Sequence, residues 1–277
     1  DKEFGGYFDT EADYKDEFIT SRLKEESNWA IFPINPHSYD SINISQSTPN
    51  PASPSSHNYL GTDDRGRDVL ARLIYGFRLS VLFAFALTAI GIIIGIFFGA
   101  IQGYFAGRVD LFMQRFIEIW SSMPELYILI IFSSLFEPSI FLLIVLLSLF
   151  GWMSLSDYVR AEFLKGRNME YVIAARTLGL SNTKIILKHI LPNSMVSVIT
   201  FLPFRISGAI LILTSLDFLG LGVPPDTPSL GELLAQGKEN IEAWWLSLST
   251  FLVLVGTLLM LIFIGEGIRE SLDSRSS

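Results

Sequence analysis

The 277-residue chain contains no cysteine and few charged residues. Without cysteine there is no disulfide framework, no thiol nucleophile and no cysteine-ligated metal site. Charged residues make up 17% of the sequence, whereas soluble globular proteins carry about 25%. Half of the chain (50%) is hydrophobic, and these residues are grouped in blocks. Such blocks are typical of membrane spans, so we predict an all-α integral membrane protein.

Common catalytic motifs are also missing. The sequence has no GxxxxGK[ST] phosphate-binding run, since Gly237 and Lys238 are followed by Glu239 and lack the upstream glycine. It has no HExxH or GxSxG motif either. His37 and His57 stand alone in a polar segment, so we expect no metal site there. We therefore expect a chain that is not an enzyme, without catalytic residues and without a cofactor of its own.

Five hydrophobic blocks have the length of about 20 residues that a bilayer requires. We predict membrane spans over residues 79–101, 112–134, 139–157, 194–219 and 245–267. Just before the first block, the apolar residues of 69–77 follow a helical period with Arg72 on the polar side, which predicts an amphipathic interfacial helix. The chain thus divides into an acidic, proline-rich segment (1–60), with a short polar helix expected within 11–26, and a transmembrane domain (61–277).

The distribution of charge predicts the orientation of these spans. The loop of residues 158–192 carries six basic residues against two glutamates, whereas residues 220–243 carry one lysine against four acidic residues. Positively charged loops stay in the cytoplasm. The loop and the C-terminus are therefore predicted to be cytoplasmic and residue 1 periplasmic, and we expect a sixth span upstream of residue 1. A net charge of −8 with one basic loop does not indicate nucleic-acid binding.

Four charged residues fall within the predicted spans: Glu118, Glu125, Arg205 and Asp217. Charges at such depth are costly and mark either an ion pair or a transport pathway. We favour a structural ion pair between Arg205 and one of the two glutamates, because an unpaired buried charge costs more than a paired one. The alternative is that Arg205 faces an aqueous cavity and attracts a substrate carboxylate. The glutamates also leave a secondary transporter open as an alternative function.

Small residues and prolines shape the predicted spans. Gly91, Gly95 and Gly99 lie four residues apart, which predicts close contact between two helices. Pro124 and Pro203 interrupt the second and fourth spans, where they allow kinks.

The segment NMEYVIAARTLGLSNTKIILKHILP, residues 168–192, reads as two short helices separated by a glycine. We predict Asn168 as the cap of the first helix and Ser181 as the cap of the second. Gly179 between them is expected to adopt the left-handed conformation that ends a helix, and Pro192 to terminate or redirect the second helix. By its spacing alone, this segment either docks on a partner or lies on lipid headgroups.

The same segment resembles the cytoplasmic loop of permease subunits of bacterial ABC importers for dipeptides, oligopeptides and nickel. That loop has Glu-Ala-Ala, three residues, Gly, nine residues, Ile, one residue and Leu-Pro. The positions that match here are Ala174, Ala175, Gly179, Leu191 and Pro192. Ile173 replaces the glutamate and His189 replaces the isoleucine, and His189 begins a HILPN run that is usual in the peptide branch.

Four further segments are similar to that family, so the resemblance covers the chain from about Leu60 to its C-terminus. They are LGTDDRGRDVLARLIYGFR (60–78), GYFAGRVDLFMQRFIEIWSSMP (103–124), LDFLGLGVPPDTPSLGELL (216–234) and GEGIRESLD (265–273). The wording of RFIEIW, FGWMSL and SLDFLGLG is closest to the Yej-type branch, which transports oligopeptides and microcin C. Thr214, Asp217 and Arg205 depart from the family pattern, so no substrate contact is carried over.

The resemblance implies a type I ABC importer permease in the bacterial inner membrane. Such a subunit pairs with a second, homologous permease and with cytoplasmic ATP-binding subunits or a tandem ATPase, which hold ATP and Mg. A periplasmic substrate-binding protein delivers the peptide. The cytoplasmic loop 158–193 would contact the ATP-binding subunit through residues of 168–192, and the resemblance singles out Ile173, Ala174, Ala175, Arg176, Gly179, Leu180 and Ser181. The protein would then move peptides into the cytoplasm by alternating access.

Overall fold

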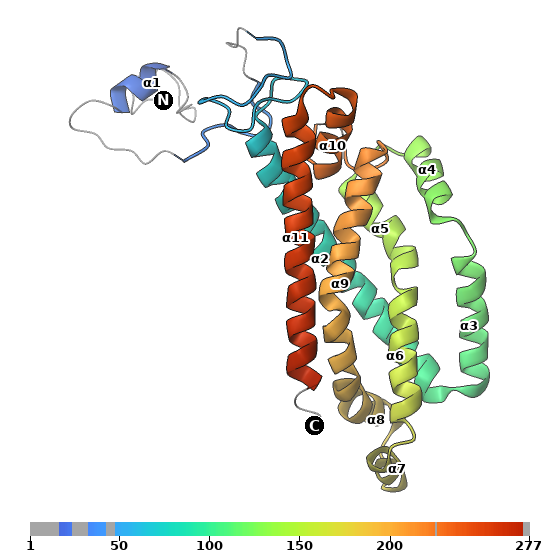
Figure 1. The fold of residues 1–277 in the computed structure, drawn as a ribbon. Helices are drawn as coiled ribbons and strands as arrows, with labels where there is room; N and C mark the ends of the chain where they lie inside the picture. Colours follow the sequence, from blue (N-terminus) through green and yellow to red (C-terminus); the bar gives the residue numbers. More distant parts are fainter. Residues whose placement is uncertain (1–16, 24–32, 43–47, 225, 274–277) are drawn as a thin grey trace.

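The computed structural model describes residues 17–23, 33–42, 48–224 and 226–273. Over these ranges the chain is helical apart from turns, irregular segments and two isolated β-bridges. The helices are α1 (Glu17–Leu23), α2 (Val69–Phe105), α3 (Gly107–Ser121), α4 (Glu125–Leu135), α5 (Ile140–Gly151), α6 (Met153–Gly166), α7 (Glu170–Thr177), α8 (Asn182–Ile185), the π-helix η2 (Ile186–Ile190), α9 (Leu191–Phe218), α10 (Leu230–Glu239) and α11 (Trp244–Asp273). The long helices stand side by side in an elongated bundle, with α10 at one end and α7 at the other (Figure 1).

The predicted membrane-spanning architecture is confirmed. Within the described ranges, four helical stretches are long and apolar enough to cross a membrane, and the count is five if a bent pair of helices forms one span. The bent pair is α3 with α4, which meet at 62°. Pro124 at this break is the N-cap residue of α4, as expected of a residue that cannot donate a backbone hydrogen bond. The second predicted span, 112–134, is therefore not one continuous helix.

The other predicted spans lie within longer helices. Residues 79–101 are the middle of α2, and 245–267 are the middle of α11. The third span extends past residue 157 to Gly166, because α6 follows α5 after a break at Trp152. The fourth span agrees with α9, which contains Pro203 without ending there. Of the polar helix expected within 11–26, the structure describes α1, and the remaining residues of that stretch lie outside the described ranges.

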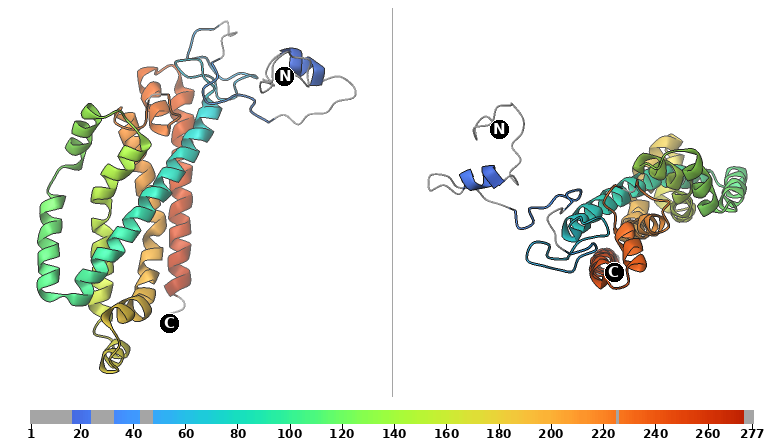
Figure 2. Two further views of the ribbon diagram at one scale, coloured as in Figure 1. Left: turned by 180° about the vertical axis from the view of Figure 1, so that it is seen from behind. Right: turned by 90° about the horizontal axis from the view of Figure 1, so that it is seen from above.

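The predicted interfacial helix before the first span is not a separate element. It is the first part of α2, a single 37-residue helix that crosses the bundle obliquely (Figures 1 and 2). Asp68 caps this helix by accepting a hydrogen bond from the Ala71 amide at 2.8 Å. The prediction that Arg72 lies on an exposed polar face was wrong, since its side chain is fully buried. The acidic partners that allow this burial come from outside the helix and are described below.

The glycine stripe of α2 packs against α6, as predicted. A Cβ atom added at Gly99 would lie 2.5 Å from the Ser156 carbonyl oxygen, which is too close for any residue but glycine. Gly103 continues the stripe, with the Arg160 carbonyl oxygen at the same distance of 2.5 Å. The two helix backbones therefore lie in direct contact along several turns.

Candidate functional site

The α7 end of the bundle is anchored through one face of α7. Val172 and Ala175 are buried in an apolar cluster with Phe163 of α6 and Ile185 of α8. Arg176 lies over the ring of Tyr104, near the end of α2, at 5.6 Å from the ring centroid. The Tyr104 hydroxyl donates a hydrogen bond to Asn182 at 2.7 Å. These contacts attach α7 to α2 and place it in one apolar cluster with α6 and α8, although α7 protrudes beyond the bundle (Figure 1).

The opposite face of α7 is exposed and includes apolar side chains. Ile173 is 52% exposed and Leu178 is 80% exposed, and Ala174 between them is also exposed. Among the predicted coupling residues, Gly179 and Ser181 are exposed as well, and those that face the bundle are the buried Ala175 and the half-buried Leu180. The apolar part of this outer face, here called the α7 apolar face, is Ile173, Ala174 and Leu178, and the exposed Glu170 and Thr177 lie beside it.

Leu178 was missed in the sequence because it falls outside the family pattern. Its exposure on the same side as Ala174 could have been inferred from the sequence, because residues four apart lie on the same side of a helix. The structure places it at the C-cap of α7, directly before Gly179.

The turn after α7 has the predicted geometry. Gly179 has φ +80°, in the left-handed region, and a Cβ atom added there would meet nothing within 4 Å. Ser181 precedes α8 as its N-cap residue, but its side chain makes no capping hydrogen bond. The predicted cap Asn168 was wrong by one position, since Met169 is the N-cap residue of α7 and the Asn168 amide bonds to the Leu164 carbonyl.

Pro192 does not terminate the second helix, which corrects the prediction for this residue. The chain continues from α8 through η2 into α9 as one stretch, Asn182–Phe218. Pro192 lies in the first turn of α9, where a missing N–H group is tolerated. The π-helical turn immediately before it, in which the Leu191 amide bonds to the Ile186 carbonyl, brings the chain to that position.

A cavity of about 550 Å³ lies in the membrane-spanning part of the bundle. Its walls come from α2, α9, the α3–α4 break and the α5–α6 break. Glu125 and Arg205 both line it, together with the hydroxyl groups of Thr88, Ser121 and Ser154. Two of the four predicted intramembrane charges therefore meet at one cavity.

The predicted ion pair of Arg205 with a glutamate was wrong. The guanidinium donates hydrogen bonds to the Gly151 carbonyl at 2.6 Å and to the Ser154 hydroxyl at 3.0 Å. Gly151 is the last residue of α5, where helix carbonyls lack intrahelical partners and attract a positive charge. Gly91 makes room on α2, since a Cβ atom there would lie 3.1 Å from Arg205 Nη2. Arg205 therefore caps the broken third span.

The other two charges lie away from Arg205. Glu118 on α3 pairs with the exposed Arg115 at 2.5 Å. Asp217 is buried at the end of α9, where it accepts hydrogen bonds from the Val223 amide at 2.8 Å and from the Ser229 hydroxyl at 2.5 Å. Ser229 is the N-cap residue of α10, so Asp217 holds the loop after α9 against the start of α10.

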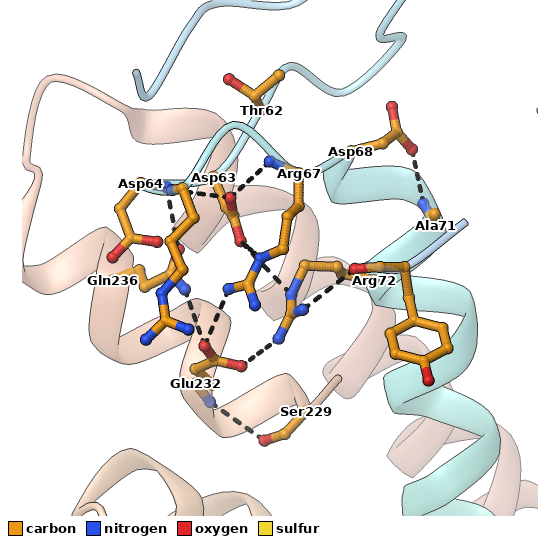
Figure 3. A network of polar contacts seen from close by, with 12 residues as sticks. Thr62, Asp63, Asp64, Arg67, Asp68, Ala71, Arg72, Ser229, Glu232 and Gln236 are labelled. Carbon is orange, nitrogen blue, oxygen red and sulfur yellow. Dashed lines mark hydrogen bonds and ion pairs between the residues drawn. The ribbon is translucent and has the colours of Figure 1, made fainter. Parts of the chain in front are cut away.

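A network of buried charges joins α2 to α10 (Figure 3). Asp63 is fully buried and accepts hydrogen bonds from the Arg67 amide at 2.8 Å and from Arg67 Nε at 2.7 Å. Glu232 of α10 pairs with Arg67 at 3.2 Å and also with Arg72. Gln236 donates to Glu232 at 3.1 Å. This set of two arginines and two carboxylates, the α10 charge network, was not predicted as a unit.

Arg72 and Asp68, at the start of α2, also hold the segment that precedes this helix. Arg72 donates to the Tyr39 carbonyl at 3.2 Å, and the carboxylate of Asp68 accepts from the amide groups of Asn35 and Asn58, each at 2.8 Å. The described residues of 33–60 are thereby fixed to the top of α2 in the view of Figure 1. The sequence signal for this site is the TDDRGRD run, in which three aspartates and two arginines lie directly before a helix.

Comparisons with known proteins agree on one family. The family model of the binding-protein-dependent transport system inner membrane component matches residues 91–277. The chain is 49% identical to the inner membrane ABC transporter permease protein YejE of Escherichia coli (strain K12), over 99% of this chain and 80% of the relative. It is 46% identical to the peptidoglycan transport system permease protein YejE of Agrobacterium fabrum, over 100% of this chain and 78% of the relative.

A more distant relative and a solved structure extend these likenesses. The oligopeptide transport system permease protein OppC of Haemophilus influenzae is 38% identical over 79% of this chain and 71% of its own length. Among solved structures, an inward-facing form of the MetNI methionine ABC transporter matches with a TM-score of 0.61, over 73% of this chain and 96% of that chain. At 15% identity this last likeness concerns the fold alone.

Proposed function

Because the chain belongs to the family of binding-protein-dependent transport system inner membrane components, we propose that it is the membrane-spanning subunit of an ATP-driven peptide importer. The relatives named for oligopeptide, dipeptide and peptidoglycan transport support peptides as the substrate class. A secondary transporter that uses Glu118 and Glu125 is not favoured, since the relatives are ABC permeases and the two carboxylates do not share a site.

In this proposal the two ends of the bundle face different compartments of the cell. The α7 end is cytoplasmic, which agrees with the basic charge of residues 158–192. The α10 end is periplasmic, where a substrate-binding protein delivers the peptide. A second, homologous permease completes the pathway in the inner membrane, and a cytoplasmic ATP-binding subunit holds ATP and Mg. This chain is the non-catalytic membrane subunit of that assembly.

The α7 apolar face carries the proposal. A protruding helix with exposed Ile173 and Leu178 fits an apolar groove on the ATP-binding subunit, whereas its inner face is already packed. When that subunit moves, α7 would move with it. The apolar cluster of Val172 and Ala175 would transmit this displacement to α6, and the Arg176–Tyr104 contact would transmit it to α2. Rigid-body movement of these helices would then expose the central cavity to alternate sides of the membrane.

Replacing Leu178 by aspartate tests the coupling role. The charge cannot enter an apolar groove without a desolvation cost, so we expect peptide uptake to fall at least tenfold (about 1.4 kcal/mol). Uptake and ATP hydrolysis are measured in proteoliposomes that contain the complete transporter. Leu178→Met is the matched control, because it retains an apolar side chain at the same position. Normal uptake by Leu178→Asp, with the ATP-binding subunit retained at wild-type levels, would contradict the docking role of α7.

A further inference from the structure

The central cavity lies near mid-depth of the bundle. Thr88 is close to the middle of α2 (Val69–Phe105), and Arg205 is close to the middle of α9 (Leu191–Phe218). Its volume of about 550 Å³ falls within the range of about 300–1,000 Å³ that small-molecule sites occupy. Part of its wall is formed by the α3–α4 and α5–α6 breaks, and interrupted spans commonly line substrate sites in transporters.

The two charges of this cavity differ in how well they are compensated. Arg205 is engaged by the Gly151 carbonyl and the Ser154 hydroxyl. The carboxylate of Glu125, the first residue of α4, has no hydrogen bond and no ion pair with any residue that the structure describes. The free backbone amides at the start of α4 offset part of its charge, as for any acidic residue in a first helical turn. The remaining charge faces the cavity.

We propose that Glu125 binds the ammonium group of the peptide in transit. Carboxylates at membrane depth commonly pair with a positive group, and a peptide with a free N-terminus carries one. The inference rests on the proposed function, because it takes a peptide as the ligand. It adds the group that is recognised and the side chain that recognises it.

The remaining lining suits the rest of a short peptide. Thr88 and Ser121 line the cavity, and their hydroxyl oxygens can accept hydrogen bonds from peptide N–H groups. Leu147, Phe150 and Ile212 supply apolar wall against which side chains of varied shape pack. Arg205 lines another part of the cavity wall, and its positive charge repels an ammonium group, which therefore favours the side of Glu125. A site of this kind recognises the peptide terminus that all substrates share and is tolerant of their side chains.

Cysteine modification tests the charge preference without a transport assay. Since the chain has no native cysteine, Gly208→Cys provides a single thiol in this subunit. Gly208 lines the cavity, and a Cβ atom added there meets nothing within 4 Å. In the purified complete transporter, the modification rates by aminoethyl and by hydroxyethyl methanethiosulfonate are compared on this chain by mass spectrometry. We expect the ratio of cationic to neutral rate to fall about tenfold in Gly208→Cys with Glu125→Gln.

The matched control is Glu118→Gln in the same Gly208→Cys background. Glu118 lies seven residues earlier on the same broken span but is exposed and paired with Arg115, so the ratio should change less than twofold. An unchanged ratio in the Glu125→Gln variant would overturn the proposal, and it is also the result expected if a cationic side chain of the second permease occupies Glu125.

Transport then separates this inference from the proposed function. Uptake of trialanine is measured in proteoliposomes with the substrate-binding protein outside and ATP inside. We expect Glu125→Gln to lower the uptake rate about tenfold at an unchanged melting temperature, and Glu118→Gln to retain it. If the wild-type transporter takes up no peptide, the proposed function fails. If the wild type transports trialanine and Glu125→Gln does so equally well, only the role of Glu125 fails.

Discussion

The two ends of the bundle are stabilised in opposite ways. At the α10 end, Asp63, Arg67, Arg72 and Glu232 form a network in which the arginines and Asp63 are almost completely buried. At the α7 end, a short helix is attached by an apolar inner face and one cation–π contact. Buried ion pairs fix one geometry, because removal of any member leaves an uncompensated charge. An exposed apolar face instead leaves a surface that a partner can cover, so the first end is built as a fixed platform and the second as a contact element.

The largest expected effect comes from breaking the fixed end. Arg72→Met removes one cation and leaves Asp63 and Glu232 with a single arginine, so the free energy of unfolding should fall by about 3–5 kcal/mol. The measurement is chemical or thermal unfolding of the purified protein in detergent. Arg65→Met is the matched control, because the Arg65–Asp226 pair is exposed and such pairs contribute about 0–1 kcal/mol. Equal loss from both substitutions would show that the network has no special role.

Arg205→Gln tests a contact between the two ends of the bundle, the hydrogen bond from Arg205 to the Gly151 carbonyl. Loss of the charged hydrogen bond to the Gly151 carbonyl should lower the free energy of unfolding by about 1.5–3 kcal/mol, because this carbonyl then lacks its partner at the break between α5 and α6. Arg115→Gln on the exposed surface of α3 should change it little. An unchanged melting temperature together with lost uptake would instead assign Arg205 to substrate binding.

Gly179→Val tests the contact element itself. A β-branched residue is strained at φ +80°, at a cost of about 1–2 kcal/mol for the left-handed conformation, although its Cβ atom would meet no neighbour within 4 Å. We expect membrane insertion to persist while ATP hydrolysis is uncoupled from uptake, because the strained turn would tilt α7 relative to the ATP-binding subunit. Gly179→Asn is the control, since asparagine tolerates this conformation. Coupled, normal uptake by the valine variant would show that the turn geometry is not needed.

Features that depend on local sequence were predictable. Runs of apolar residues located the four long apolar helical stretches and the bent pair α3–α4. The fourfold spacing of Gly91, Gly95 and Gly99 predicted a close helix contact, and Gly179 was correctly predicted to be left-handed. Each of these follows from residues within one helix or one turn.

Features that depend on distant neighbours were not predictable. Arg72 was placed on a polar face because its partner Glu232 lies 160 residues away in the sequence. The partner of Arg205 is a backbone carbonyl that is free only because α5 ends at Gly151, and no residue type marks that break. Hydropathy also did not separate the buried from the exposed residues of α7, since Val172 and Ile173 are equally apolar and only packing distinguishes them.

The continuity of α2 links the two ends mechanically. Its 37 residues, at 1.5 Å per residue, make a rod of about 55 Å that carries Arg72 near one end and Tyr104 near the other. A rod of that length that tilts by about 5° around its midpoint displaces its two tips by about 2 Å in opposite directions. The glycine stripe packs on α6 and can serve as the pivot of such a tilt. A displacement of the Tyr104 end of α2 would then move Arg72, and with it the α10 charge network, in the opposite direction.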